Sequence, residues 1–305
     1  MGGVVGALPT RSTILKICAL VIKKTLKLNL YKRIISRLDI KNGILVKGIS
    51  LEGVRNLGNP DFFSKRYYDD LIDEIHFHNV IATLYDSNMV FEIIERNSKQ
   101  IFVNVSVGGG VKTLKEVDKL LRIGVDKVVI NSAAVKDPKF LKELVDIYGA
   151  STISVNIETA LINGKYQVFI ETGRVNTGIE LFDWIDRVQS LNVGEIIITD
   201  IFSEGKMKGY NLNLFKQIRK KVDIQLVAHG GAGSKENILN IFKECNVDAV
   251  SIASLFHYNY LKPTKGSELK GSNYFIHFLD EKEKIGISIL ELKKFLKSSG
   301  VNVRL

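Results

Sequence analysis

The chain has 305 residues, of which 45% are hydrophobic and 25% are charged, and its formal net charge is +10. This length and composition suit one large domain with a sizeable core, in the size range of a single barrel. The first 38 residues hold eight basic side chains and no acid, which leaves 35 basic and 33 acidic residues elsewhere. Because a nucleic-acid groove needs many clustered Lys and Arg residues, we expect no nucleic-acid partner.

The N-terminal segment, residues 1–30, is predicted to be a basic extension that precedes the folded domain. Its apolar run at 14–22 is shorter than the roughly 20 residues that cross a bilayer, so we expect no membrane span. A targeting peptide or an interfacial helix also has this basic, acid-free composition. Cys18 and Cys245 are too few for a disulfide framework or a zinc site, which favours a cytoplasmic protein.

Residues 31–260 are predicted to contain eight short strands that alternate with amphipathic helices. Apolar spacing indicates helices at 113–123 and 139–148, for example. Alternating strands and helices are typical of a parallel sheet, and eight such units close into a (β/α)₈ barrel. The strands are expected at 33–39, 74–79, 101–106, 126–131, 153–158, 195–200, 224–229 and 248–252.

An internal repeat supports this barrel. The glycine turn, helix and strand of 108–135 recur at 230–256, so that Gly108 corresponds to Gly230 and Ser132 to Ser254. Segments 73–79 and 194–200 also correspond, as do 37–43 and 156–162. Four units that match in the same order indicate that the barrel consists of two duplicated (βα)₄ halves.

Two segments depart from the repeated pattern. The connection at 40–61 carries glycine at positions 43, 48, 53 and 58 and exceeds ordinary loop lengths. It is therefore a candidate mobile lid over an active site, or simply a long loop. After Tyr260 the chain becomes polar, and residues 261–305 are predicted to form a C-terminal tail, appended to the barrel, with one helix at 288–298.

Carboxylates end two strands that correspond in the duplication. Asp39 ends the first strand and Glu158 ends the fifth, which puts them on opposite sides of one barrel mouth. The loops at this end build the active sites of such barrels. Two carboxylates in different surroundings can divide the roles of general acid and general base. Alternatively, they only stabilise loops or pair with Lys47.

Two glycine-rich turns, 107–111 and 229–233, each follow a strand and open a helix. Free backbone N–H groups and the helix dipole favour an anion at such a turn, although glycine there can also serve backbone geometry alone. Since the repeat relates the two turns, a ligand with a phosphate at each end fits them best. The strand ends Asn131-Ser132 and Ala253-Ser254 complete the two cradles, and His229 is a candidate phosphate donor or proton carrier.

The opposite ends of the strands begin with Arg33, Glu74, Lys127 and Glu195. If these side chains point inward, they form a charge-balanced ring that closes the barrel floor. The remaining histidines show no ligand spacing with Cys or acidic residues, so we expect no metal and no cofactor.

Several segments, in order, resemble the HisF family, the cyclase subunit of imidazole glycerol phosphate synthase, over roughly residues 31–260. They include KRIISRLDIKNG, LVKGISLEGVRNLGNP, VGGGV, GVDKVVINSAAV, TGIELFDW, HGGAG and IASLFHY. The resemblance implies a barrel that takes ammonia from a HisH-like glutaminase subunit, as a heterodimer. It implies that ammonia cleaves and cyclises a bisphosphorylated ribulosyl-formimino carboxamide nucleotide into imidazole glycerol phosphate and aminoimidazole carboxamide ribotide.

The resemblance also implies roles for individual residues. Asp39 and Glu158 correspond to the two catalytic acids, and Lys47 lies on the first loop. The floor charges correspond to an ammonia gate over which the glutaminase docks. One phosphate is assigned to Gly109, Gly110, Asn131 and Ser132, and the other to Gly205, Gly230, Gly231, Ala253 and Ser254, near Glu204 and His229.

The chain departs from the family pattern at its mouth. Glu158 and Glu204 each stand where the family has Asp, Asn79 replaces an Asp, and His229 replaces a Ser. A carboxylate displaced by about 1 Å can cost on the order of a hundredfold in rate. These changes and the tail keep an alternative open, an ammonia conduit for an enzyme that amidates a surface-glycan sugar. A phosphosugar isomerase on the same duplicated barrel is a further alternative.

Overall fold

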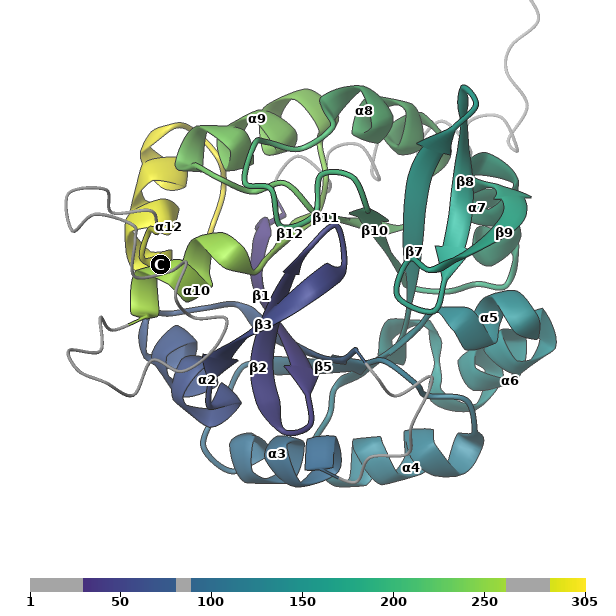
Figure 1. The fold of residues 1–305 in the computed structure, drawn as a ribbon, viewed down its shortest axis with the longest axis horizontal. Coiled ribbons are helices and arrows are strands. Elements are labelled where there is room, and N and C mark those ends of the chain that lie inside the picture. The colour runs from purple at the N-terminus through teal and green to yellow at the C-terminus, as the bar shows by residue number, and fades with distance from the viewer. Residues whose placement is uncertain (1–29, 81–88, 262–285) are drawn as a thin grey trace, which may run out of the picture.

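The computed structural model describes residues 30–80, 89–261 and 286–305. Within these ranges, eight parallel strands close into a barrel in the order β1-β4-β5-β6-β7-β10-β11-β12, and β12 pairs with β1. Helices surround the barrel (Figure 1). The predicted (β/α)₈ fold is therefore confirmed. The predicted basic extension lies almost wholly outside the described residues, as does the polar part of the predicted tail at 262–285.

Most strands begin and end within two residues of the predicted positions. The third is shifted by two to three residues towards its glycine turn, and the fifth continues four residues beyond its predicted end, to Ile162. The barrel strands are β1 (Arg33–Lys41), β4 (Glu74–Asn79), β5 (Asn104–Gly108), β6 (Lys127–Ile130), β7 (Ile153–Ile162), β10 (Glu195–Asp200), β11 (Gln225–His229) and β12 (Ala249–Ile252). Because side chains alternate along each strand, every second residue points into the barrel and the others point to the helices.

Several helices begin at a side chain that caps their free backbone N–H groups. Thr113 and Glu116 form a reciprocal capping box, and Ser234 caps the helix that follows the second glycine turn. The helices are α2 (Pro60–Asp69), α3 (Met89–Ser98), α4 (Leu114–Arg122), α5 (Ser132–Lys136), α6 (Pro138–Tyr148), α7 (Leu181–Ser190), α8 (Leu212–Lys221), α9 (Lys235–Cys245), α10 (Ser254–Tyr260) and α12 (Ile289–Ser298), with a 3₁₀ turn η1 (Ala150–Thr152).

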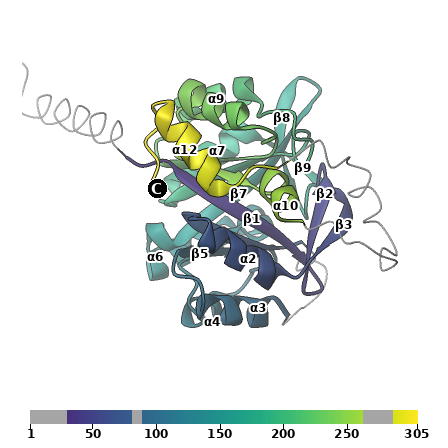
Figure 2. The same ribbon diagram turned by 90° about the vertical axis from the view of Figure 1, so that its left-hand side faces the viewer.

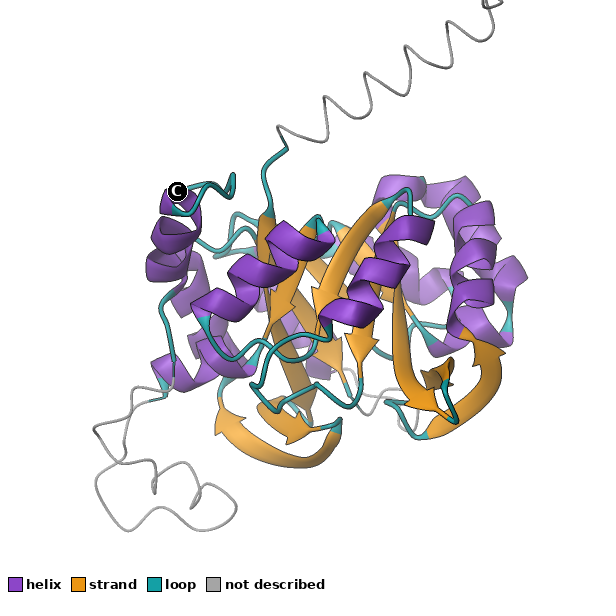
Figure 3. Cartoon of the chain, turned by 90° about the horizontal axis from the view of Figure 1, so that it is seen from above, coloured by secondary structure: helices purple, strands orange, loops and turns teal. Residues whose placement is uncertain are grey.

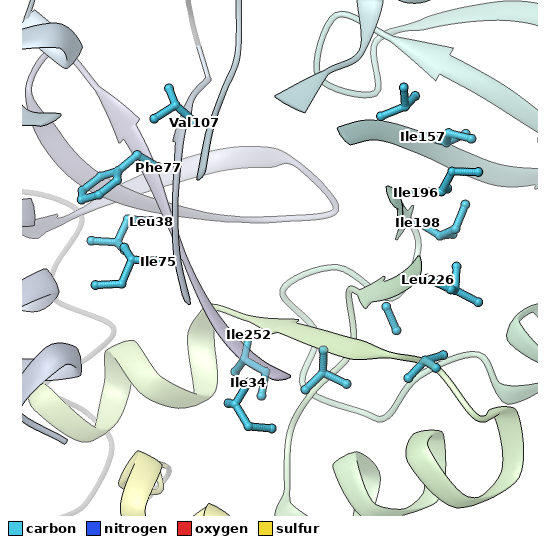
Figure 4. Packing of buried hydrophobic residues seen from close by; sticks show 14 of the residues in the cluster. Ile34, Leu38, Ile75, Phe77, Val107, Ile157, Ile196, Ile198, Leu226 and Ile252 are labelled. Carbon is cyan, nitrogen blue, oxygen red and sulfur yellow. The ribbon is translucent and has the colours of Figure 1, made fainter. Parts of the chain in front are cut away.

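The main hydrophobic core lies between the barrel and its helices. Outward-facing residues such as Ile34, Leu38 and Phe77 are buried there (Figure 4). Their burial stabilises the fold by roughly 2 kcal/mol for each large side chain. Since this core takes the outward positions of the strands, the inward positions are free to carry polar residues.

An antiparallel hairpin extends from the same strand of each half. β2 (Ile44–Ile49) and β3 (Glu52–Gly58) extend β1, and β8 (Lys165–Ile170) and β9 (Val175–Glu180) extend β7. Figure 3 shows both hairpins at one end of the barrel. The connection predicted as a long loop at 40–61 is therefore mostly hairpin. β2 pairs with β1 so that Val46 lies opposite Asp39.

The C-terminal helix belongs to the outer layer of the fold, which corrects the expectation of an appended tail. Ile289, Leu292 and Leu296 of α12 are buried in the main core. Lys293 is also buried and pairs with Asp73 at 2.7 Å. Figure 2 shows α12 beside α9, at the end of the barrel away from the β2–β3 hairpin. A lysine on an amphipathic helix is expected at the surface, and the burial of Lys293 is explained by its ammonium partners, Asp73 and the backbone carbonyl of Leu71.

Candidate active site at the barrel mouth

Asp39 lies near the end of β1, is 5% exposed, and pairs with two cations. Nε of Arg37 donates to it at 2.8 Å, and Nζ of Lys47 lies 3.3 Å away. Burial alone raises the pKa of an aspartate, but the charges of Arg37 and Lys47 outweigh it and hold the pKa of Asp39 well below its usual range. Asp39 is therefore a carboxylate at neutral pH, able to accept a proton.

Glu158 occupies the corresponding position on β7 and is 1% exposed. Burial raises its pKa to about 7, although the backbone N–H of Gly173, at 2.8 Å, and the charge of Arg37 act in the opposite direction. Glu158 therefore holds a proton in part of the molecules at neutral pH. A carboxyl with this pKa can donate a proton where Asp39 cannot.

The two acids share one interior. The charge of Asp39 contributes to the raised pKa of Glu158, and Arg37 interacts with both. Arg37 is 1% exposed and was not singled out in the sequence. It lies two residues before Asp39, and Arg33 lies four before Arg37, so the alternation of β1 puts all three inside the barrel. The alternation of inward and outward side chains along this strand could have identified Arg37 as an interior residue from the sequence.

The first glycine turn follows β5. Gly109 and Gly110 have φ of 91° and 81°, and a Cβ at Gly109 would lie 2.1 Å from the carbonyl oxygen of Asn79. Backbone packing therefore requires glycine here, whatever the turn binds. Across the turn, Oδ1 of Asn131 is buried without a hydrogen-bond partner among the described residues, and Oγ of Ser132 accepts from the backbone N–H of Glu171.

The second glycine turn follows β11 and is built in the same way. Gly230 and Gly231 have φ of 95° and 113°, and a Cβ at Gly231 would lie 2.2 Å from the carbonyl oxygen of Gly209. Here the predicted residues meet around one cavity. It is lined by Lys47, Glu204, Gly205, Met207, His229, Gly230, Gly231, Ala232, Ser251, Ile252, Ala253 and Ser254.

The β2–β3 hairpin lies over this mouth and is fastened to the loop after β10 (Figure 1). Lys47 is buried and pairs with Glu204, whose carboxylate also accepts from the backbone N–H of Leu51. The backbone N–H of Ser50 donates to the carbonyl of Glu204 at 2.9 Å. The cavity beneath has a volume of about 20 Å³, which is room for roughly one water molecule. A group as large as phosphate does not fit in this space.

The four predicted floor charges meet at the opposite end. Arg33 pairs with Glu74 at 2.6 Å and with Glu195, while Lys127 lies 3.1 Å from Glu74 and 3.4 Å from Glu195. The two cations hold the pKa of Glu195 below its usual value despite burial. A separate layer of aliphatic residues lies inside the barrel. It is formed by Ile35, Val129, Ile197, Val227 and Ala249.

Histidines fill part of the interior above that layer. His76 and His78 face inward from β4, next to Arg37. Burial, and then the charge of Arg37, lowers the pKa of His76 to about 3, so this ring is neutral. Across residues 30–80, 89–261 and 286–305, no three His, Cys, Asp or Glu side chains come close enough to hold a metal ion. No helix in those ranges has the length and hydropathy to cross a membrane.

Fold and site together define a class of protein, a duplicated (β/α)₈ barrel with buried carboxylates and glycine turns at the carboxyl ends of its strands. Within this class, residues 33–262 match the model of a family described as histidine biosynthesis protein. The chain belongs to this family.

Curated relatives extend the match over most of the chain. A protein of Bacillus cereus (strain Q1) is 38% identical over 230 residues, which cover 75% of this chain and 91% of the relative. Proteins of Natranaerobius thermophilus and Dehalococcoides mccartyi are each 35% identical over 276 residues, which cover 90% of this chain and 100% and 99% of those relatives. All three are named imidazole glycerol phosphate synthase subunit HisF.

Proposed function

We propose that this protein is the cyclase subunit of an imidazole glycerol phosphate synthase. It uses ammonia to convert a bisphosphorylated ribulosyl-formimino carboxamide ribotide into imidazole glycerol phosphate and aminoimidazole carboxamide ribotide, as a cytoplasmic enzyme of histidine biosynthesis. The curated names of the relatives support this activity, and they do not favour the glycan-amidating alternative. The observation that carries the proposal is the pair of buried acids, Asp39 and Glu158, whose pKa values are shifted in opposite directions in one barrel interior.

The proposed reaction needs one ionised carboxyl group and one protonated carboxyl group. When ammonia replaces a carbonyl oxygen, the nitrogen must lose protons and the departing oxygen must gain them. Asp39, ionised between Arg37 and Lys47, is suited to accept a proton. Glu158, with its raised pKa, is suited to donate one to the oxygen. This assignment makes Asp39 the general base and Glu158 the general acid.

We assign the two glycine turns to the two phosphates of the substrate. Gly109, Gly110, Asn131 and Ser132 hold one, and Gly205, Gly230, Gly231, Ala253 and Ser254 hold the other with His229. Backbone N–H groups at strand–helix turns are suited to anions, and the repeat relates the two turns. Lys47 and Glu204 fasten the hairpin over the second phosphate, so that substrate enters when their ion pair opens.

Ammonia is assigned to a path that begins at the floor. Arg33, Glu74, Lys127 and Glu195 act as the gate, and a HisH-like glutaminase subunit docks over them as a heterodimer. Large apolar side chains at the floor end support a docked protein, since Tyr31, Leu71 and Phe102 are 55%, 47% and 78% exposed. A Phe102→Ser variant is expected to bind the glutaminase subunit of the same organism at least tenfold more weakly, because a buried aromatic side chain contributes much of the binding energy of an interface. Its turnover of free ammonium is expected to be unchanged. Phe202→Ser, an exposed phenylalanine after β10, is the matched control.

The activity is tested with the purified protein, ammonium and the bisphosphorylated nucleotide. We expect the imidazole product to form in the wild type and to fall to background in Asp39→Asn. If the wild type gives no more product than that variant, the proposed reaction is wrong. If Asp39→Asn and Glu158→Gln both keep full activity, the assignment of the two acids is wrong.

A further inference from the structure

His229 is the last residue of β11, and only one of its two ring nitrogens has a hydrogen-bond partner among the described residues. Its Nδ1 lies 2.9 Å from the backbone carbonyl oxygen of Ser251. A carbonyl oxygen only accepts hydrogen bonds, so Nδ1 carries the hydrogen and donates it. In the neutral ring Nε2 is then an unprotonated acceptor. The residue is 2% exposed, and Nε2 has no hydrogen-bond partner within the described part of the chain.

His229 lines a cavity that holds several groups suited to an anion and one carboxylate, Glu204, which pairs with Lys47. His229 lines it together with Gly230 and Gly231 of the second glycine turn, and Lys47 brings a cation to it. Oγ of Ser254 lines the same cavity and is also buried without a partner among the described residues. Ser254 can donate to an anion, but the lone pair of a neutral His229 repels one. The cavity suits a phosphate only if Nε2 gains a hydrogen.

Charged groups from several elements surround this ring. Burial, followed by the charges of Arg37 and Lys47, lowers the pKa of His229 well below its usual range, and Asp39 acts in the opposite direction. His229 is therefore neutral in the empty site. A bound anion adds negative charge beside Nε2 and shifts this balance towards the protonated ring. The titratable and charged groups that face His229 are Arg37 and Asp39 on β1, Lys47 on β2, His78 on β4 and Glu204 after β10.

We propose that His229 is a proton-coupled receptor for the phosphate at the second glycine turn. When a phosphate monoester dianion enters, Nε2 takes up one proton from solvent and donates it as a hydrogen bond to a phosphate oxygen. No covalent bond forms or breaks, and the proton returns to solvent when the phosphate leaves. The inference rests on the proposed function for the identity of the ligand, and it adds that binding at this end of the substrate consumes a proton.

Proton uptake distinguishes this inference from an alternative in which neutral His229 accepts a hydrogen bond from the ligand. A ligand hydroxyl could donate to a neutral Nε2, and such binding would take up no proton. Sulfate is the sharper probe, because it has no titration of its own near neutral pH and carries no hydroxyl donor there. Glu158, with a pKa of about 7, titrates in the same range, so proton counts must be compared between variants that both retain it.

The test is sulfate binding to the full chain, measured by calorimetry at pH 7.5 in buffers of different ionisation enthalpy. We expect the wild type to take up between half a proton and one proton more per bound sulfate than His229→Gln and His229→Ser. Its affinity is expected to fall by up to tenfold per unit of rising pH, in excess of the fall in the variants, which is the limit for one linked proton. In ¹⁵N spectra of the histidines, the resonance that is missing from both variants is expected to change from an unprotonated to a protonated Nε2 on sulfate binding.

Three results overturn the inference. They are equal proton uptake in wild type and variants, an Nε2 that stays unprotonated with sulfate bound, and no response of the His229 resonance to sulfate at any concentration. The spectra of the wild type stand even if one variant folds poorly. Turnover of the nucleotide is measured separately. Product without proton uptake rejects this inference alone, and proton uptake without product rejects the proposed function alone.

Discussion

The two halves of the barrel put a buried carboxylate at the same place, where an antiparallel hairpin leaves the first strand of each half. Asp39 pairs with Val46 of the β2–β3 hairpin, and Glu158 pairs with Phe169 of the β8–β9 hairpin. Their surroundings differ. Asp39 touches the guanidinium of Arg37 and the ammonium of Lys47, whereas Glu158 accepts from two uncharged donors, the backbone N–H of Gly173 and the side chain of Asn131.

This difference turns a duplicated position into two functions. Cations keep Asp39 ionised, and burial without a paired cation keeps a proton on Glu158 in part of the molecules at neutral pH. Two carboxyl groups whose environments push their pKa values apart can divide base and acid roles. Both cations come from the first half, one from β1 itself and one from its hairpin. The asymmetry therefore arises from side chains, while the backbone of the two halves remains alike.

The largest expected effect follows from removing the charge of Asp39. Asp39→Asn is expected to lower kcat about a thousandfold, because the site loses its proton acceptor. Single-turnover kinetics with saturating ammonium measure this change. Asp186→Asn, at an exposed carboxylate on α7, is the control and keeps wild-type kcat. A loss below tenfold in Asp39→Asn contradicts the role of base.

Glu158→Gln is expected to stabilise the protein at alkaline pH. The pKa of Glu158 is raised from 4.5 to about 7, so burying the charged form destabilises the fold increasingly above pH 4.5 and fully above about pH 7. The stability gained by the variant should grow by about 3 kcal/mol between pH 4.5 and pH 8, from the size of that shift. Urea unfolding at the two pH values measures it. A pH-independent difference would mean that Glu158 is ionised without penalty.

Arg37→Met is expected to raise the pKa of Asp39 towards that of Glu158. Without the guanidinium, burial raises the pKa of Asp39, and its base form is lost as the pH falls. We expect kcat to fall severalfold at pH 6, where fewer molecules hold Asp39 ionised, and to fall less at pH 8, where most of them do. Arg37→Lys, which keeps a charge, should restore most of the pH profile. If Arg37→Met lowers kcat equally at pH 6 and pH 8, Arg37 acts through packing and does not control the pKa of Asp39.

The smallest expected effect concerns the β2–β3 hairpin, which lies over the barrel mouth. Glu204→Gln weakens the attachment of Lys47 and of the backbone N–H of Leu51. Amide hydrogen exchange at Ser50 and Leu51 is expected to become about fivefold faster, which corresponds to roughly 1 kcal/mol for one weakened buried contact. Exchange in the β8–β9 hairpin serves as the internal control. Unchanged rates in both hairpins would show that Glu204 does not hold the cover.

Most of the barrel could be predicted from sequence, because its signals are local and repeated. β-branched runs gave the strands, and the repeated glycine turns gave the relation between the halves. The β2–β3 hairpin was missed because its glycines suggested a loop, while its pairing depends on β1. Likewise, the burial of Lys293 depends on Asp73, which is far away in the chain.

The acids and the floor charges could be named from their positions at strand ends, but their states could not. Nothing local to Asp39 or Glu158 in the sequence says that their pKa values move in opposite directions. Both acids are buried, and the difference arises because Arg37 and Lys47, the latter on another strand, both pair with Asp39. Arg37 was within reach, because it alternates with Asp39 along β1, but a buried arginine is unusual enough to be passed over.

The titration of the two acids in one sample tests the central claim most directly. Carboxyl ¹³C spectra of protein labelled at Asp and Glu, assigned with Asp39→Asn and Glu158→Gln, follow both groups from pH 4 to pH 9. We expect Asp39 to remain ionised throughout and Glu158 to titrate near pH 7. Two acids that titrate together, or a Glu158 already ionised at pH 5, would contradict the division of roles between the halves.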